Sequence, residues 1–215
     1  MARPARGFFI SVEGADGSGK STQVRRLAEH LRAMGHDVVV TREPGGGGEG
    51  AEALRNMLLN GPADRWSPMA EALLMYAARA EHLDKLVRPA LRDGKTVLTD
   101  RFADSTIAYQ GAAGGLGEAR VAALHQAVVG GDDPDLTIIL DVPAEIGLAR
   151  TQRRKGLETR FEGKGEAYQA KARAAFLDIA RAYPLRCRVI DAGADEETVA
   201  RAVAKAVDAA LQSRA

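Results

Sequence analysis

This sequence of 215 residues has one cysteine, few aromatic residues and almost no net charge. The single thiol, Cys187, excludes an internal disulfide framework and is typical of a protein from a reducing compartment. Lys and Arg number 30 and Asp and Glu 29, so the net charge of +1 argues against a general binder of nucleic acids or membrane surfaces. We therefore expect small-molecule partners, no nucleic acid, no membrane and a cytoplasmic location.

Long apolar runs and zinc-ligand spacings are also missing. The short basic start, residues 1–6, is not followed by a long apolar segment, so we expect neither a signal peptide nor a transmembrane span. None of the four histidines lies at a spacing typical of zinc ligands. An apolar fraction of 46 % is enough for one sizeable core, and no repeat or linker divides the chain. We expect a single domain over residues 1–215.

The most informative stretch is an apolar run that continues into glycines. Residues 8–13 predict a buried strand, and residues 14–21 match the phosphate-loop pattern G-x-x-x-x-G-K-S. The glycines let backbone N–H groups point at phosphate oxygens, Lys20 can reach the β- and γ-phosphates, and the Ser21 hydroxyl can bind Mg²⁺. The sequence therefore predicts a nucleoside triphosphate site. Its expected ligands are Gly14, Ala15, Asp16, Gly17, Ser18, Gly19, Lys20, Ser21 and Thr22.

Five short apolar segments alternate with stretches at helical spacing. The expected strands are 8–13, 38–41, 96–100, 136–142 and 188–191. The expected helices are 23–34, 52–59, 67–92, 104–110, 118–129, 143–155, 166–182 and a last one from 195, with a kink or early end of the long helix at Pro89. This alternation predicts an α/β fold of the P-loop NTPase type, a five-stranded parallel sheet with helices on both faces. Ligands of such sheets lie beyond the carboxyl ends of the strands.

Three arginines from separate segments are expected at that edge of the sheet. Arg42 and Arg101 follow strands directly, and Arg79 lies on the long helix. A guanidinium group binds phosphate through two parallel hydrogen bonds. Because the phosphate loop already serves the triphosphate, the additional arginines indicate a second phosphorylated ligand. A phosphomonoester has a second pKa of about 6, so as an acceptor it needs cations and Mg²⁺ but no general base.

A second basic cluster follows the fourth expected strand, interleaved with glutamates. It comprises Arg150, Arg153, Arg154, Lys155, Arg160 and Lys164. Mixed charges of this kind are typical of a solvated surface, but they also suit a lid, at about 150–165, that closes over the phosphates. In that interpretation Arg153 or Arg154 is an internal arginine finger, a role worth up to about 10³–10⁵ in rate.

Five motifs in order along the chain resemble the thymidylate kinase family, which phosphorylates dTMP to dTDP with MgATP. They are Glu13-Gly14-x-Asp16-Gly17-x-Gly19-Lys20-Ser21, Arg42-Glu43-Pro44-Gly45-Gly46, Tyr76-Ala77-Ala78-Arg79, Asp100-Arg101-Phe102 continuing to Tyr109-Gln110-Gly111, and Pro134-Asp135-Leu136-Thr137 running to Val142. One branch of the family has an arginine at the position of Gly17. The arginine-rich lid instead resembles the bacterial branch, in which the lid supplies the catalytic arginine.

The resemblance implies roles for individual residues. Asp16 would hold the sugar 3′-hydroxyl, Arg79 and Thr106 would contact the thymine edge, and Tyr109 would disfavour a 2′-hydroxyl. Met75 stands where the family usually has a phenylalanine that stacks on thymine, and a thioether can also contact a ring face. The implied dTMP site comprises Asp16, Glu43, Pro44, Met75, Arg79, Arg101, Ser105, Thr106, Tyr109 and Gln110.

The resemblance also implies a catalytic set, a metal site and an assembly. The catalytic residues would be Lys20, Arg42, Arg101, Arg153 and Arg154. Ser21 and Asp100 would hold Mg²⁺, Asp100 through water, and the family is usually a homodimer. The glycine run 45–50 is one residue longer than the family pattern and lacks its usual hydroxyl residue.

Three alternatives stay open at this point. One is another nucleoside monophosphate kinase. A second is a deoxynucleoside kinase, which would need a base near the sugar hydroxyl and no clamp for an acceptor phosphate. The third is a nucleotide-binding module without catalysis, and the intact Lys20, Ser21, Asp100 and Arg101 argue against it.

Overall fold

The computed structural model describes residues 6–153 and 164–214, and within it five strands form one parallel sheet. The strands are β1 (Phe9–Glu13), β2 (Val38–Arg42), β3 (Thr96–Asp100), β4 (Leu136–Asp141) and β5 (Cys187–Asp191). Their spatial order is β2-β3-β1-β4-β5, and each neighbouring pair is parallel. The predicted five-stranded parallel sheet is confirmed. The strand that leads into the phosphate loop lies at its centre, so the loop emerges in the middle of the carboxyl edge.

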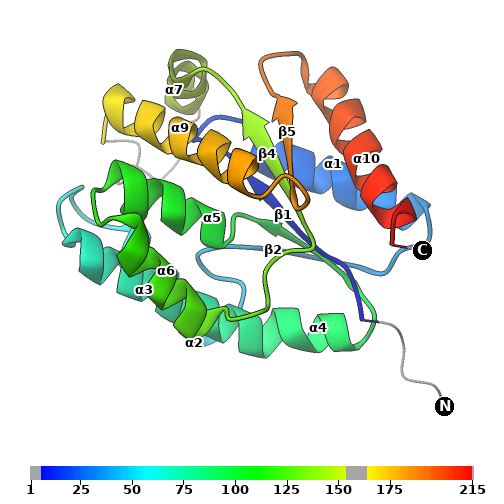
Figure 1. Ribbon diagram of the computed structural model, residues 1–215, viewed down its shortest axis with the longest axis horizontal. Coiled ribbons are helices and arrows are strands. Elements are labelled where there is room, and N and C mark those ends of the chain that lie inside the picture. The colour runs from blue at the N-terminus through cyan, green and yellow to red at the C-terminus, as the bar shows by residue number, and fades with distance from the viewer. Residues whose placement is uncertain (1–5, 154–163, 215) are drawn as a thin grey trace.

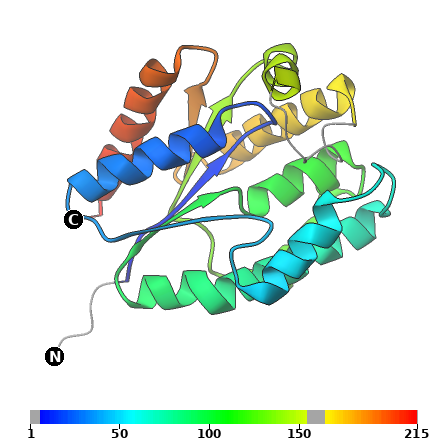
Figure 2. The same cartoon turned by 180° about the vertical axis from the view of Figure 1, so that it is seen from behind.

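Helices cover both faces of this sheet (Figures 1 and 2). One face carries α1 (Lys20–Ala33) and α10 (Glu196–Gln212). The other carries α3 (Pro68–His82), α4 (Arg88–Arg92), α6 (Glu118–Val128) and α9 (Glu166–Ala182). The short helix α5 (Ala103–Thr106) follows β3, α2 (Glu49–Leu59) packs on α3, and α7 (Ala144–Arg153) follows β4. Within the described residues, none of these helices combines the length and apolar character needed to cross a bilayer.

Successive side chains of a strand point to opposite faces of the sheet, so the core lies on both faces. Ile10 and Val12 of β1 pack against Leu27 of α1, whereas Phe9 of the same strand packs on the opposite face. There Phe9 meets the ring of Phe102 edge-on, at 5.0 Å between centroids. Apolar side chains on both faces of a parallel strand explain why the central strands appear as continuous apolar runs in the sequence.

Two helices depart from the sequence prediction. The stretch expected as one helix over 67–92 leaves α-helical geometry at His82 rather than at Pro89, through a π-helical turn, η1 (Leu83–Val87). Proline has no N–H to donate to the carbonyl four residues earlier, and its ring would collide with that carbonyl. The wider π-helical turn before Pro89 makes room for the ring. The predicted helix 104–110 is α5 followed by a second π-helical turn, η2 (Ile107–Ala113). Elsewhere the bounds differ by up to three residues within the described part of the chain, which does not include residues 154–155 of the predicted helix 143–155.

Candidate active site

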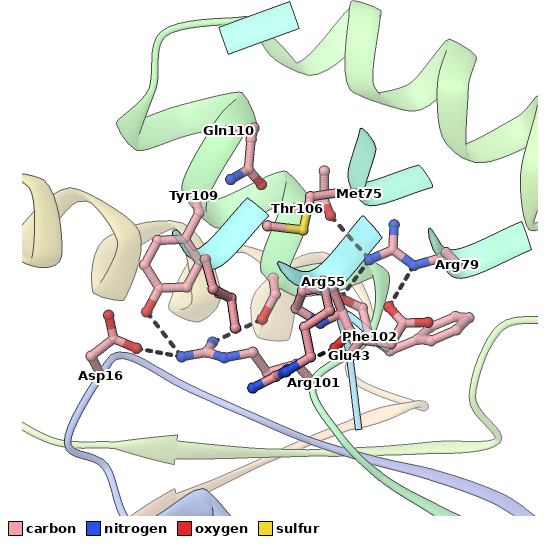
Figure 3. Close-up of a pocket in the computed structure, with 13 residues that line it drawn as sticks. Asp16, Glu43, Arg55, Met75, Arg79, Arg101, Phe102, Thr106, Tyr109 and Gln110 are labelled. Carbon is pink, nitrogen blue, oxygen red and sulfur yellow. Dashed lines mark hydrogen bonds and ion pairs between the residues drawn. The ribbon is translucent and has the colours of Figure 1, made fainter. Parts of the chain in front are cut away.

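A pocket of about 670 Å³, counting its open mouth, lies beyond the carboxyl ends of the central strands (Figure 3). All ten residues predicted for the acceptor nucleotide lie on its wall. Three further lining residues, Arg55, Leu59 and Phe102, were not predicted. The first two come from α2, whose position over the pocket has no local sequence signal. The volume is that of a pocket for a small organic ligand.

The phosphate loop beside this pocket closes around its own lysine. Lys20 is the first residue of α1, and its Nζ donates to the carbonyl oxygens of Gly14 at 3.1 Å and Ala15 at 2.9 Å. Burial, together with the positive charge of Arg101, lowers the pKa of Lys20 to about 8. The loop thus holds a cation ready for phosphate oxygens at the N-terminus of a helix.

The two predicted Mg²⁺ ligands are in contact with each other. The Ser21 hydroxyl donates to Asp100 Oδ2 at 2.6 Å across the gap between α1 and the end of β3. No group of three or more His, Cys, Asp or Glu side chains within 6–153 and 164–214 is arranged to hold a metal ion. Mg²⁺ usually keeps several waters and binds through one or two protein oxygens plus substrate phosphates, so this pair fits that ion.

Arg101 joins the phosphate loop to the pocket. Its guanidinium donates to Asp16 Oδ1 at 2.5 Å and to Gly14 O at 3.2 Å in the loop. On the pocket side it donates to Ser105 Oγ at 3.0 Å and lies 5.1 Å from the ring centre of Tyr109. Burial opposes ionisation of Asp16, but the nearby Arg101 and Lys20 hold the pKa of that carboxyl below its usual range. A fixed cation therefore contacts both the phosphate loop and the pocket.

The backbone at Arg101 is held in a left-handed conformation by a buried carboxyl. Its φ is +71°, the one positive value at a non-glycine position in the described part of the chain. Glu13, at the end of β1, accepts from Phe102 N at 2.7 Å and from Ser105 Oγ at 2.6 Å. Burial and the nearby Asp104 raise the pKa of Glu13 to about 8. Such strain is typical of functional sites, and the sequence indicated no role for Glu13.

The opposite end of the pocket is organised by Arg79. Its Nε donates to Glu43 Oε2 at 2.8 Å, and its Nη2 donates to Thr106 Oγ1 at 3.0 Å and Phe102 O at 3.2 Å. The guanidinium also lies 4.6 Å from the ring centre of Tyr76. Figure 3 shows Arg79 and Asp16 at opposite ends of the pocket. The site thus has one end near the phosphate loop and one end remote from it.

Some predicted residues lie apart from the pocket. Arg42, at the end of β2, pairs with Glu52 of α2 at 3.2 Å and is exposed. Arg150 donates to Ala192 O at 3.0 Å, away from the phosphate loop. Arg153 is the last residue of α7, and Arg154 with the rest of the predicted lid to residue 163 lies outside the described residues.

Helix α9 supplies contacts that the sequence did not indicate. Gln169 Nε2 donates to Asp16 Oδ2 at 2.9 Å, and the Tyr168 hydroxyl donates to Tyr109 O at 2.9 Å. Lys164, just before α9, pairs with Glu71 of α3 at 3.2 Å, and Gln110 also donates to Glu71, at 2.8 Å. The helix after the predicted lid therefore contacts the pocket at Asp16 and Tyr109.

The fold and this pair of adjoining sites define the class as a P-loop phosphotransferase. A family model described as thymidylate kinase matches residues 12–203. The chain is 57 % identical over 202 residues to a thymidylate kinase of Caulobacter vibrioides, covering 94 % of this chain and 96 % of that one. It is 54 % identical over 200 residues to one of Dinoroseobacter shibae, covering 93 % and 95 %. The chain belongs to the thymidylate kinase family.

A solved structure supports the same assignment of fold. The crystal structure of thymidylate kinase from Ehrlichia chaffeensis superposes with a TM-score of 0.76 at 34 % identity. The match covers 94 % of this chain and 99 % of that chain. The P-loop NTPase fold predicted from residues 14–21, and the family resemblance drawn from the five motifs, are confirmed.

Proposed function

We propose that this protein transfers the γ-phosphoryl group of MgATP to dTMP and forms dTDP. The observation that carries the proposal is the position of Arg101, which contacts Gly14 and Asp16 in the phosphate loop and Ser105 in the pocket. A cation there can neutralise charge on the donor and the acceptor phosphates while the phosphoryl group passes between them. An acceptor that is already anionic needs no general base in this arrangement.

The pocket supports a pyrimidine nucleotide in one orientation. Figure 3 shows Arg101 and Arg79 at separate places along the pocket, so a nucleotide with its phosphate at Arg101 would bring its base to Arg79. The sugar is attached at N1 of a pyrimidine, so the substituent at position 4 lies on the far side of the ring. Thymine has a carbonyl oxygen there, which accepts from a guanidinium, whereas cytosine has an amino group, which does not. A donor at Arg79 therefore favours dTMP over dCMP.

Two parts of the phosphate machinery complete the proposal. Ser21 and, through water, Asp100 would hold Mg²⁺, which neutralises charge on the β- and γ-phosphates when bound. Arg42 would contact phosphate after leaving Glu52, because an exposed pair of this kind contributes only about 0–1 kcal/mol.

The proposed function is tested by a coupled assay of ADP release with ATP and a panel of acceptors. We expect the fastest turnover with dTMP, slower turnover with dUMP, UMP, CMP and AMP, and loss of turnover when EDTA removes Mg²⁺. Fast turnover of thymidine would instead identify a deoxynucleoside kinase. Absence of turnover with every monophosphate would leave a nucleotide-binding module.

We propose that the lid supplies the catalytic arginine, because the phosphate loop has no room for one. Gly17 has a φ of +77°, and a Cβ atom there would lie 2.1 Å from the carbonyl oxygen of Gly147 in α7. We expect that Arg153→Ala or Arg154→Ala, or both, lowers kcat more than it raises the KM for ATP. Steady-state kinetics of both variants provide the check. An unchanged kcat in both variants would mean that the lid only covers the site and supplies no catalytic arginine.

Nucleotide affinity is expected to depend on pH through Lys20. Its pKa of about 8 in the free protein means that the ammonium form, which phosphate requires, is lost as the pH rises through 8. Binding of ATP above that pH must then take up a proton. Calorimetric titrations at pH 7 and pH 9 should show an ATP affinity about tenfold weaker at pH 9. Equal affinities at the two values would contradict the assignment of Lys20.

We also propose a homodimer and a single domain over 1–215 with the lid at about 150–165. Helices α2 and α3 expose three large apolar side chains, Met57 at 41 %, Met69 at 36 % and Leu73 at 50 %, which suit a face that packs on a second copy. Light scattering at micromolar concentration should give twice the monomer mass.

We propose a cytoplasmic location, which the lone buried thiol, Cys187, supports.

A further inference from the structure

A chain of buried polar side chains lies behind the base end of the pocket and ends at Arg79. Thr41 Oγ1 is 2.8 Å from His82 Nε2, His82 Nδ1 is 2.9 Å from Glu43 Oε1, and Glu43 Oε2 accepts from Arg79 Nε at 2.8 Å. The side chains of His82, Glu43 and Arg79 are 0 %, 4 % and 2 % exposed. Buried polar groups in such networks fix one arrangement of the side chains.

His82 does not line the pocket, so it acts on a ligand only through its neighbours. It lies three residues after Arg79 on the same face of α3, at the point where the helix widens into η1. The glycine run closes over it. A Cβ atom at Gly47 would lie 2.5 Å from His82 N, and one at Gly46 would lie 2.3 Å from Thr41 Oγ1. Absence of side chains at these glycines lets the loop seal the network from water.

The hydrogen bonds to Glu43 have a defined direction. A carboxylate accepts only, so His82 Nδ1 carries the proton that Glu43 Oε1 receives, while the other ring nitrogen, Nε2, is hydrogen-bonded to the Thr41 hydroxyl. With Oε1 engaged in this way, Glu43 contacts Arg79 through Oε2 and Nε alone. Arginine and carboxylate groups otherwise favour two parallel hydrogen bonds.

This arrangement leaves one guanidinium nitrogen available. Arg79 Nη2 contacts Thr106 and Phe102, whereas Nη1 is buried and has no hydrogen-bond partner among residues 6–153 and 164–214. A buried donor without a partner is costly, so it favours a ligand that brings an acceptor. Without His82, Glu43 Oε1 would turn to Nη2, compete with Thr106 and rotate the guanidinium.

We propose that His82 is a positioning residue for base recognition: it restrains Glu43 and thereby keeps Arg79 Nη1 free to donate to the position-4 carbonyl of the pyrimidine. The inference rests on the proposed function and deepens it, because it explains how the pocket selects a carbonyl over an amino group. His82 selects the base without touching it.

The test compares two substitutions that each keep one ring nitrogen. In His82→Asn the amide nitrogen takes the place of Nδ1 and still donates to Glu43, whereas in His82→Gln it takes the place of Nε2 and reaches Thr41. We expect H82Q to lower kcat/KM for dTMP by about tenfold to a hundredfold, mainly through KM, and to leave kcat/KM for dCMP within about threefold. H82N should keep dTMP efficiency within about threefold of the wild type.

Two further variants secure the result. Thr41→Val removes the far end of the chain and should reduce dTMP efficiency by about twofold to fivefold, again without a matching loss for dCMP. If thermal melting shows that H82Q does not fold, the Thr41→Val variant takes its place as the test. His30→Gln, on the opposite face of the sheet in contact with Asp208, is the matched control and should behave as the wild type.

Equal losses for dTMP and dCMP in H82Q, or no loss of dTMP efficiency in H82Q, would overturn the inference. If T41V carries the test, an unchanged ratio of the two efficiencies would overturn it as well. A wild-type protein without dTMP turnover would refute the proposed function instead. An active wild type with an unaffected H82Q would refute the role of His82 alone.

Discussion

Replacement of Arg101 with alanine is expected to lower kcat for dTMP phosphorylation by about 10²–10³-fold, with the fold intact. The guanidinium is the group that contacts the phosphate loop at Gly14 and Asp16 and the pocket at Ser105. Its loss would remove the cation between the two phosphates and leave the Asp16 carboxylate facing them. Coupled ADP release measures kcat, and circular dichroism checks the fold.

Two further variants serve as comparisons for Arg101→Ala. Arg101→Lys keeps the charge but loses the planar pair of donors, so it should fall between alanine and the wild type. Arg25→Ala removes an exposed arginine of α1 that pairs with Glu29, and it should leave kcat unchanged. Near-normal turnover of Arg101→Ala would show that the acceptor phosphate is held elsewhere.

Lys20→Ala is expected to abolish efficient use of ATP, with a loss in kcat/KM of at least about 10²-fold. Lys20 Nζ is enclosed by the loop carbonyls of Gly14 and Ala15, and it is the cation predicted to reach the β- and γ-phosphates. Without it, those carbonyl oxygens face the triphosphate. Initial rates at varied ATP concentration measure the loss.

A lysine outside the site provides the comparison. Lys205→Ala removes an exposed lysine of α10, a helix that contains none of the predicted ATP ligands. The substitution should leave the ATP kinetics unchanged. An equally small effect in Lys20→Ala would mean that the backbone N–H groups alone bind the triphosphate.

The sheet and the phosphate loop could be predicted because their determinants are local. An apolar run of five or six residues between turn signals specifies a buried parallel strand, and the glycines of residues 14–21 specify the loop. The π-helical turns could not be predicted. A single π-helical turn is slightly wider than an α-helical turn, and the spacing of apolar residues in the sequence is nearly the same for both. Pro89 indicated a break, and the structure places it about two turns earlier, at His82.

Site residues divide in the same way. Those that directly follow strands, such as Arg101, could be placed from the sheet alone, and the family motifs supplied Arg79 and Tyr109. Partners joined by tertiary contacts had no local signal: Gln169 meets Asp16 from 153 residues away. Arg42 lies at the carboxyl end of β2, the predicted edge of the sheet, but its side chain turns to Glu52, which depends on how α2 packs.

The central claim is that this crevice holds two nucleotides with their phosphates facing each other at Arg101. A crystal structure with dTMP, Mg²⁺ and a non-hydrolysable ATP analogue tests it most directly. We expect the dTMP phosphate within hydrogen-bond distance of the Arg101 guanidinium and the thymine beside Arg79. A dTMP phosphate that points into bulk water, away from Arg101, would contradict the proposed mechanism.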